Sequence, residues 1–482
     1  MKLGFNTASH AVISIMAGWA ITVAAASAAT DPGIRGGAPG AGDPVPGLTP
    51  DQKTLFLDGQ ETFAEVDALG DGLGPRFNLD GCLGCHSFPV HGGSSPPVNP
   101  QVKLATDLGA KNTLPPFITA NGPIREARFQ FTPSGERDGG VHSLFVISGR
   151  VDPSGSAATC NAAQEDFATQ TRRGNVSLRI PTPTYGLGLV ENIPDTTLTA
   201  NLAANGQQKA ALGISGHLNT NGNDGRIARF GWKAQNVSLL LFSGEAYNVE
   251  MGITNELFQT ERDLNPNCQT NTVPNDISGK EGLETPDATL SDIEKFALYM
   301  RFLGAPIPST TAPGGAASIT RGQQAFASVG CALCHTPSMM TTDTTIKALG
   351  KQKVALYSDL ALHHMGPTLA DNVIQGAAGP DEFRTAPLWG LGQRVFFLHD
   401  GRTKDLVQAI QLHASAAGRA ATLAAAASTD ATFSSDATFN RGGGGGSSGG
   451  WTQASEANRV IANFNALSDA SKQDLLNFLR SL

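Results

Sequence analysis

The chain has 482 residues, and its 34 Lys and Arg against 42 Asp and Glu give a net charge of −8. This length allows two or three domains with substantial cores, and the acidic balance argues against a nucleic-acid partner. The 56 Gly and 28 Pro, with only 16% charged residues, favour loop-rich domains over long regular elements.

The first 29 residues are typical of a signal peptide. Lys2 supplies the positive end, residues 11–26 form an apolar run, and small residues such as Ala28 and Ala29 suit signal peptidase. We therefore expect export to the periplasm. An uncleaved membrane anchor is the alternative, although the run is short for a membrane span.

Two C-x-x-C-H motifs dominate the sequence and predict two covalently bound haem c groups. In such a motif each thiol adds to a haem vinyl group and the histidine ligates the iron. Two incidental pairs of thiols are the alternative, and two chance matches are far less common than one. The motif residues are Cys82, Cys85 and His86, and Cys331, Cys334 and His335.

The remaining two cysteines, Cys160 and Cys268, are predicted to form a disulfide. An oxidising compartment outside the cytoplasm permits this bond, which would join two insertions of the first half. Two free buried thiols are the alternative.

The two halves of the chain repeat the same motifs in the same order, which indicates an internal duplication. Each half has a Gly-x-x-x-Phe helix, a C-x-x-C-H motif, a Pro-x-aromatic-Gly-Leu-Gly motif, an Asp-Gly-Arg motif and a closing helix that begins Leu-Ser-Asp. Ser291 and Ser468 are the expected N-caps of the closing helices. The other motifs lie at 59–63 and 322–326, 183–188 and 387–392, and 224–226 and 400–402.

This order predicts a mainly α, loop-rich fold with two cytochrome c-like domains. We expect an N-terminal haem domain over 30–306, which carries insertions, and a C-terminal domain over 318–482. A linker over 307–317 belongs to a stretch rich in Pro, Gly, Ala and Thr that begins at Gly304. Residues 441–450, nearly all Gly and Ser, indicate a surface loop.

Function depends on the iron face opposite each motif histidine. For the second haem the candidate ligands are His363, His364, Met365, His399 and His413. If strong ligands cap both irons, the protein only transfers electrons, whereas an open iron can bind peroxide or oxygen.

The duplication predicts an open face at the first haem. Alignment of residues 405–413 with 236–244 places Gly244, which cannot ligate iron, about where His413 lies. Nearby Glu250 is a candidate acid/base for peroxide cleavage, and a solvated surface acid is the alternative. Trp232 and Trp389 are candidate electron relays, and ordinary core tryptophans are the alternative.

The sequence resembles the bacterial di-haem oxidoreductases that are relatives of the di-haem cytochrome c peroxidases. The resemblance runs from about residue 59 to 482. The stretches that carry it are 76–86, 179–188, 248–252, 382–392 and 397–402.

The resemblance implies a peroxide-reacting N-terminal haem and an electron-transfer C-terminal haem. Glu250 matches the glutamate that lies over the reactive haem in the peroxidases. His413 stands where those enzymes carry a methionine ligand, and this difference implies a lower potential for the second haem. Leu240, Leu241 and Phe242 occupy the region where the peroxidases have a glutamine. Calcium between the domains and a homodimer are further expectations of the resemblance, and the sequence identifies no calcium ligands.

The leading hypothesis is a periplasmic peroxidase that reduces hydrogen peroxide with electrons from a small cytochrome c or copper protein. A non-catalytic electron-transfer cytochrome is the first alternative, and it requires a cap such as His142 or His217 on the first haem. An oxidase that uses high-valent haem on another substrate is the second alternative.

Overall fold

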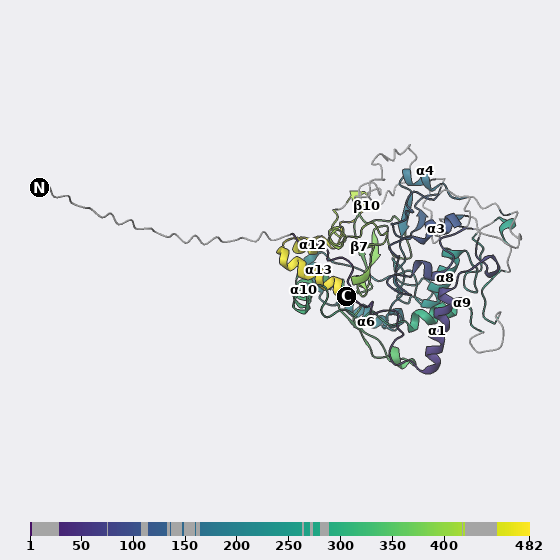
Figure 1. Ribbon diagram of the computed structural model, residues 1–482, viewed down its shortest axis with the longest axis horizontal. Coiled ribbons are helices and arrows are strands. Elements are labelled where there is room, and N and C mark those ends of the chain that lie inside the picture. The colour runs from purple at the N-terminus through teal and green to yellow at the C-terminus, as the bar shows by residue number, and fades with distance from the viewer. Residues whose placement is uncertain are drawn as a thin grey trace.

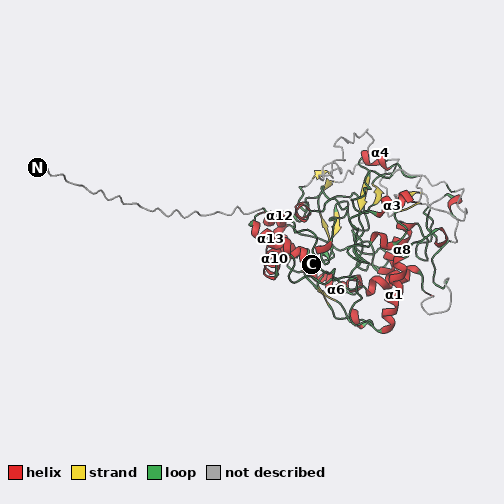
Figure 2. Ribbon diagram, in the orientation of Figure 1, coloured by secondary structure: helices red, strands yellow, loops and turns green. Residues whose placement is uncertain are grey.

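The computed structural model describes residues 1, 28–74, 76–107, 114–132, 135, 147–148, 160, 164–262, 265–269, 273–279, 289–416, 418–419 and 451–482. Most of the signal-peptide segment, His142 and the loop 441–450 therefore lie outside the described residues. Helices outnumber strands in the described chain, and loops are abundant (Figure 2). Its α-helices are α1 Pro50–Ala64, α2 Cys82–Cys85, α3 Pro100–Asp107, α4 Phe167–Arg172, α5 Leu187–Glu191, α6 Asp195–Ala203, α7 Gly206–Leu212, α8 Leu239–Met251, α9 Asp292–Phe302, α10 Ala316–Val329, α11 Leu406–Gln411, α12 Asn458–Asn465 and α13 Asp469–Ser481.

The strands are short and pair into two-stranded antiparallel ribbons. The pairs are β1 with β3, β2 with β4, β5 with β6, β7 with β8, and β9 with β10. Their bounds are β1 Arg76–Phe77, β2 Glu126–Phe129, β3 Ile147–Ser148, β4 Val176–Arg179, β5 Met339–Met340, β6 Lys353–Val354, β7 Leu362–His364, β8 Glu382–Arg384, β9 Gly418–Arg419 and β10 Trp451–Thr452.

In the first half, α1 and α8 both pack against α9, and the three helices lie close together (Figure 1). Gly59 of α1 meets the backbone of α9, because a Cβ there would lie 2.5 Å from the carbonyl oxygen of Lys295. Phe63 continues the contact, with its ring centroid 4.9 Å from that of Tyr299. In the Gly-x-x-x-Phe motif, the glycine thus permits close approach of the two helices, and the phenylalanine fills the space between them one turn further on.

The second half repeats this arrangement with α10 and α13, which lie at the opposite side of the molecule (Figure 1). A Cβ on Gly322 would lie 1.9 Å from the carbonyl oxygen of Asp474 in α13. Phe326 packs on Phe478 with ring centroids 5.5 Å apart. Ser291 and Ser468 stand at the N-caps of α9 and α13, as the sequence predicts.

Several contacts join residues of the predicted N-terminal domain, 30–306, to residues of the predicted C-terminal domain, 318–482. Asp31 pairs with Arg480 of α13 at 2.6 Å, and buried Lys233 pairs with buried Asp371 at 3.0 Å. The first residues of the folded body therefore pack on the C-terminal half. Among the described residues, no helix combines the length and apolar character needed to cross a bilayer.

Candidate haem sites

Each C-x-x-C-H motif forms one tight turn beside the helix pair of its own half. The backbone N–H of His86 donates to the carbonyl of Cys82 at 3.1 Å, and that of His335 donates to the carbonyl of Cys331 at 2.9 Å. All four motif thiols are free. The rings of Phe63 and Phe326 lie against the histidine of their own motif, with centroids 5.9 Å and 6.3 Å apart.

Both motif histidines are held in the tautomer that can bind iron. Nδ1 of His86 lies 3.1 Å from the carbonyl oxygen of Gly93, and Nδ1 of His335 lies 3.0 Å from that of Tyr357. Because a carbonyl oxygen only accepts, each Nδ1 carries the hydrogen and each Nε2 keeps its lone pair. Burial lowers the pKa of both histidines to about 4, so both imidazoles are neutral, as metal ligation requires.

A largely apolar cavity of about 220 Å³ lies beside the second motif. Cys331, Cys334 and His335 line it together with His413. His413 follows α11, whose N-cap Asp405 accepts hydrogen bonds from the first turn. Nδ1 of His413 lies 2.8 Å from the carbonyl oxygen of Ala409. His413 therefore has the same tautomer as His335 and offers a second Nε2 to the same cavity.

The other candidate histidines near this cavity have different partners. His363 is held between Asp359, 3.0 Å from Nε2, and Glu456, 2.7 Å from Nδ1. His364 lies 3.0 Å from Asp381 and 3.2 Å from Glu382. His399 stacks on Phe383 with centroids 4.3 Å apart. Acidic partners thus engage both ring nitrogens of His363 and of His364. His399 has only this ring contact and, like His413, lines the cavity.

Met365 also lines the cavity. Its thioether is the remaining candidate ligand of the second site.

Glu250 lies in the last turn of α8, on the side of the first motif. Its carboxylate accepts a hydrogen bond from the Asn78 side chain at 2.7 Å, and its carbonyl accepts one from the Asn78 backbone at 2.7 Å. Desolvation and the neighbouring Glu126 raise the pKa of Glu250 well above its usual range. Burial raises the pKa of the Cys85 thiol, and the nearby Glu250 carboxyl adds to this shift.

The structure also shows where the two residues lie that bear on whether the first haem is open or capped. Gly244 lies inside α8, where a Cβ would be 3.1 Å from the Asn255 side chain. His217 forms a bridge with Leu362 and lies 2.7 Å from Glu382, both in the C-terminal half. This placement argues against His217 as a cap of the first haem, because its partners belong to the second half.

The two tryptophans differ in their relation to the cavities. Trp232 lines the 220 Å³ cavity and also a neighbouring cavity of about 30 Å³. Its indole N–H donates to the carbonyl of Ile180 at 2.9 Å. Trp389 is buried, lines the smaller cavity and packs against Gly186. Trp232 is thus better placed than Trp389 to connect the second site with the first half.

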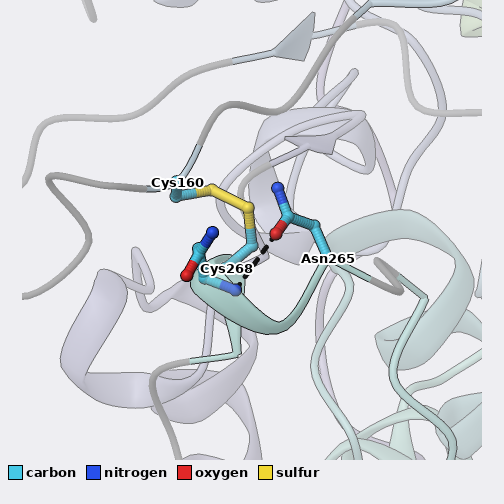
Figure 3. Close-up of a disulfide and its surroundings, with 4 residues drawn as sticks. Cys160, Asn265 and Cys268 are labelled. Atoms are coloured by element: carbon cyan, nitrogen blue, oxygen red, sulfur yellow. Dashed lines mark hydrogen bonds between the residues drawn. A yellow bond between two sulfur atoms is a disulfide. The ribbon is translucent and has the colours of Figure 1, made fainter.

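A disulfide joins Cys160 and Cys268, as the sequence predicts (Figure 3). Cys268 ends a single turn over Pro266–Cys268, in which its backbone N–H donates to the carbonyl of Asn265 at 2.8 Å. The bond links positions 108 residues apart. It therefore closes a long loop that runs across the first half.

Among the described residues, one group of three possible metal ligands lies close together: Cys334, Asp359 and His363. Its thiol belongs to the second motif, and its mixture of sulfur, nitrogen and oxygen is unlike the oxygen ligands that calcium prefers. The calcium expected from the resemblance has no assigned ligands.

Sequence reasoning missed the groups that surround the candidate ligands. Asn78 and Glu126 hold Glu250, and Gly93 and Tyr357 orient the motif histidines. Asn78 does lie in the 76–86 stretch that carries the family resemblance. Glu126, Gly93 and Tyr357 lie in other segments or irregular loops, so no sequence motif predicts their contacts.

Comparison with known proteins supports the family relationship. The family described as "di-haem oxidoreductase, putative peroxidase" matches residues 138–434, more than half of the chain. No curated protein matches. A solved structure, "Kuenenia stuttgartiensis Hydrazine Synthase Pressurized with 20 bar Xenon", is 17% identical with a TM-score of 0.21, over 41% of this chain and 56% of that chain. The match spans little more than half of that structure's length, and the likeness is too low to bear on fold or function.

Proposed function

The chain belongs to the di-haem oxidoreductase, putative peroxidase, family, and we propose that it reduces hydrogen peroxide in the periplasm. Its electrons come from a small redox protein, either a cytochrome c or a copper protein. The overall reaction consumes one peroxide, two electrons and two protons and yields two waters. The signal-peptide pattern of residues 1–29 supports the location.

The proposed architecture is a pair of cytochrome c-like domains that arose by duplication. The matching pairs α1 with α9 and α10 with α13 support it, as do the close helix approaches at Gly59 and Gly322. Each domain holds one haem c through its two motif thiols. The free thiols and the neutral, oriented histidines fit this group.

The observation that carries the proposal is an asymmetry between the two sites. At the second site, His413 and His335 present Nε2 atoms to one cavity, which suits a six-coordinate electron-transfer haem. At the first site, the prominent polar group is the carboxyl of Glu250, held by Asn78. A carboxyl group suits proton transfer to peroxide better than it suits permanent ligation of haem iron.

The haem iron, when bound, supplies the redox chemistry, and the chain supplies proton transfer and positioning. With haem bound, Glu250 would move a proton from one peroxide oxygen to the other, so that the second oxygen could leave as water. Asn78 fixes the orientation of the Glu250 carboxyl group. The raised pKa makes Glu250 a stronger base whenever its carboxyl group is deprotonated.

Electrons are proposed to enter at the second site and to reach the first through the wall that holds Trp232. Its position on both cavities supports this relay, and Trp389 is the second candidate.

The test is Glu250→Gln, which keeps the side chain's shape and removes its proton transfer. We expect a fall in peroxide turnover of about 10²–10⁴-fold, the usual contribution of general acid/base catalysis. Glu245→Gln is the matched control, because Glu245 is a buried acid on the same helix that bonds to Asn236. Unchanged turnover in Glu250→Gln would refute the assigned role. Failure of cyanide to bind either iron in the wild-type protein would favour the electron-carrier reading.

A further inference from the structure

Two arginines line the cavity of the second site, one of them buried and the other half-buried. Arg384 ends β8, and Arg394 follows the Pro-x-aromatic-Gly-Leu-Gly motif of the second half. Both line the 220 Å³ cavity that also contains Cys331, Cys334 and His335. Arg384 is only 8% exposed.

Neither guanidinium forms an ion pair with an acidic side chain of the described residues. Arg384 donates to the backbone carbonyl of Gly231 at 2.8 Å and weakly to that of Thr385 at 3.4 Å. Nε of Arg394 is buried and has no hydrogen-bond partner. Burial lowers the pKa of both arginines to about 10, and the nearby charge of Arg394 contributes to the shift at Arg384.

Two other buried arginines of this chain are paired with acidic side chains. Arg179 pairs with Asp371 at 2.8 Å, and Arg480 pairs with Asp31 at 2.6 Å. An arginine stays charged at neutral pH even after such a shift, and a buried unpaired charge is strongly unfavourable. Two of them facing one cavity therefore indicate that a ligand with negative charge completes the site.

We propose that Arg384 and Arg394 bind the two propionate groups of the second haem. A haem carries its propionates on the pyrrole rings that do not bear vinyl groups, so they point away from the thioether bonds to Cys331 and Cys334. Two carboxylates balance two guanidiniums, and the planar fork of arginine matches a carboxylate with two parallel hydrogen bonds. The arginines thereby fix the rotation of the haem within the cavity.

The same arrangement indicates which way the propionate edge faces. Arg384 and Arg394 also line the neighbouring 30 Å³ cavity, together with Trp232 and Trp389. That space holds no more than a few water molecules, so the macrocycle belongs to the larger cavity and only its propionate edge reaches the boundary. The edge of the second haem thus faces the wall that carries Trp232.

This inference rests on the proposed haem at Cys331–His335 but not on peroxide chemistry. The test uses the purified di-haem protein and two variants, Arg384→Gln and Arg394→Gln. A redox titration monitored by the absorption spectra of the haems gives the reduction potential of each haem. Steady-state peroxide turnover is measured separately. Arg321→Gln is the control, because Arg321 is an exposed arginine that pairs with Asp474.

Loss of either cavity arginine leaves one propionate charge uncompensated, which stabilises the ferric state. We expect the equilibrium constant for reduction of the second haem to fall by roughly tenfold in each Gln variant, about 59 mV for a one-electron couple. Lysine at either position should restore part of the change, because it keeps the charge and loses the fork. Arg321→Gln should leave the potential unchanged.

Unchanged potentials in both Gln variants would overturn the proposal, and so would a shift confined to the first haem. If the Gln variants do not take up haem, a crystal structure of the wild-type holoprotein decides. Propionate oxygens within about 2.7–2.9 Å of the guanidinium nitrogens support the assignment. Propionates directed elsewhere refute it. If the protein lacks peroxidase activity but shows these contacts, the proposed function is wrong and the assignment of Arg384 and Arg394 to the propionates still holds.

Discussion

His335 and His413 line one cavity, and each gives its Nδ1 hydrogen to a backbone carbonyl, at 3.0 Å and 2.8 Å. This pairing leaves two Nε2 lone pairs for one iron. It contrasts with the side of the first motif, where Glu250 is held by Asn78.

Replacement of His413 by Met should raise the potential of the second haem while the spectrum stays low-spin, because methionine opposite histidine raises haem potentials. His413→Ala should convert that haem to a high-spin or water-bound form. Absorption and electron paramagnetic resonance spectra of the ferric protein distinguish these states. His399→Phe serves as the control in the same cavity, and a loss of the low-spin signal there would point to His399 instead.

Trp232→Phe should slow electron transfer between the two haems more than Trp389→Phe does. Trp232 lines both cavities, whereas Trp389 lines the smaller one. Stopped-flow measurement on half-reduced protein, started by peroxide, gives this rate for both variants. Equal rates in the two variants and the wild type would remove tryptophan from the path.

Removal of the disulfide with the double variant Cys160→Ser, Cys268→Ser should destabilise the protein by about 2–4 kcal/mol, since the bond closes a loop of 108 residues. The midpoint of denaturation by urea measures this change. Haem content and both potentials should stay at wild-type values, because neither cysteine lies in a C-x-x-C-H motif. A parallel loss of haem would mean that the bond also supports a haem site.

Asp31→Asn should destabilise the C-terminal half by about 3 kcal/mol, the lower end of the range for breaking a buried ion pair. Arg480 is 1% exposed, and the substitution leaves its charge without a partner. Thermal unfolding of both proteins measures the loss. Asp343→Asn removes an exposed partner of Lys347 and should leave the midpoint unchanged.

The same pair sets a pH dependence. Burial opposes ionisation of Asp31, but hydrogen bonds from Arg480, Leu406 and Gly33 hold the pKa of Asp31 below its usual value. The stabilisation is therefore complete above the ordinary carboxyl pKa of about 3.9 and disappears as pH falls through the lower folded value. The difference between wild type and Asp31→Asn should shrink in that acid window, and a difference that is constant with pH would contradict the assignment.

Local sequence patterns predicted the parts of this molecule that depend on local chemistry. The C-x-x-C-H spacing identified both motif histidines, and Leu-Ser-Asp identified the N-caps Ser291 and Ser468. The position of His413 beside His335 agrees with the residue chosen from the second half, although its ligation stays a prediction.

The charge pairing of the sites could not be predicted in this way. Arg384 and Arg394 look like ordinary basic residues in the sequence, and only their place on one cavity, without an acidic partner among the described residues, makes them notable. The electron-carrier alternative uses His217 as a possible cap for the first haem, yet its partner Glu382 lies 165 positions away in the second half. Such pairings depend on how the two halves pack together. The residue pattern within one segment does not predict that packing.

The Asp31–Arg480 pair also constrains the order in which the chain can fold. Its partners are 449 positions apart, and Thr30 and Gln473 exchange further hydrogen bonds beside it. Residues 30–31 are synthesised early, but their docking surface does not exist until α13 has been made and has packed on α10. Contacts of such long sequence separation form late, because closing the intervening loop costs entropy before it gains any contact. A nascent chain that stops short of α13 would keep Asp31 exposed, and this pair would then report on whether α13 had been made and had docked.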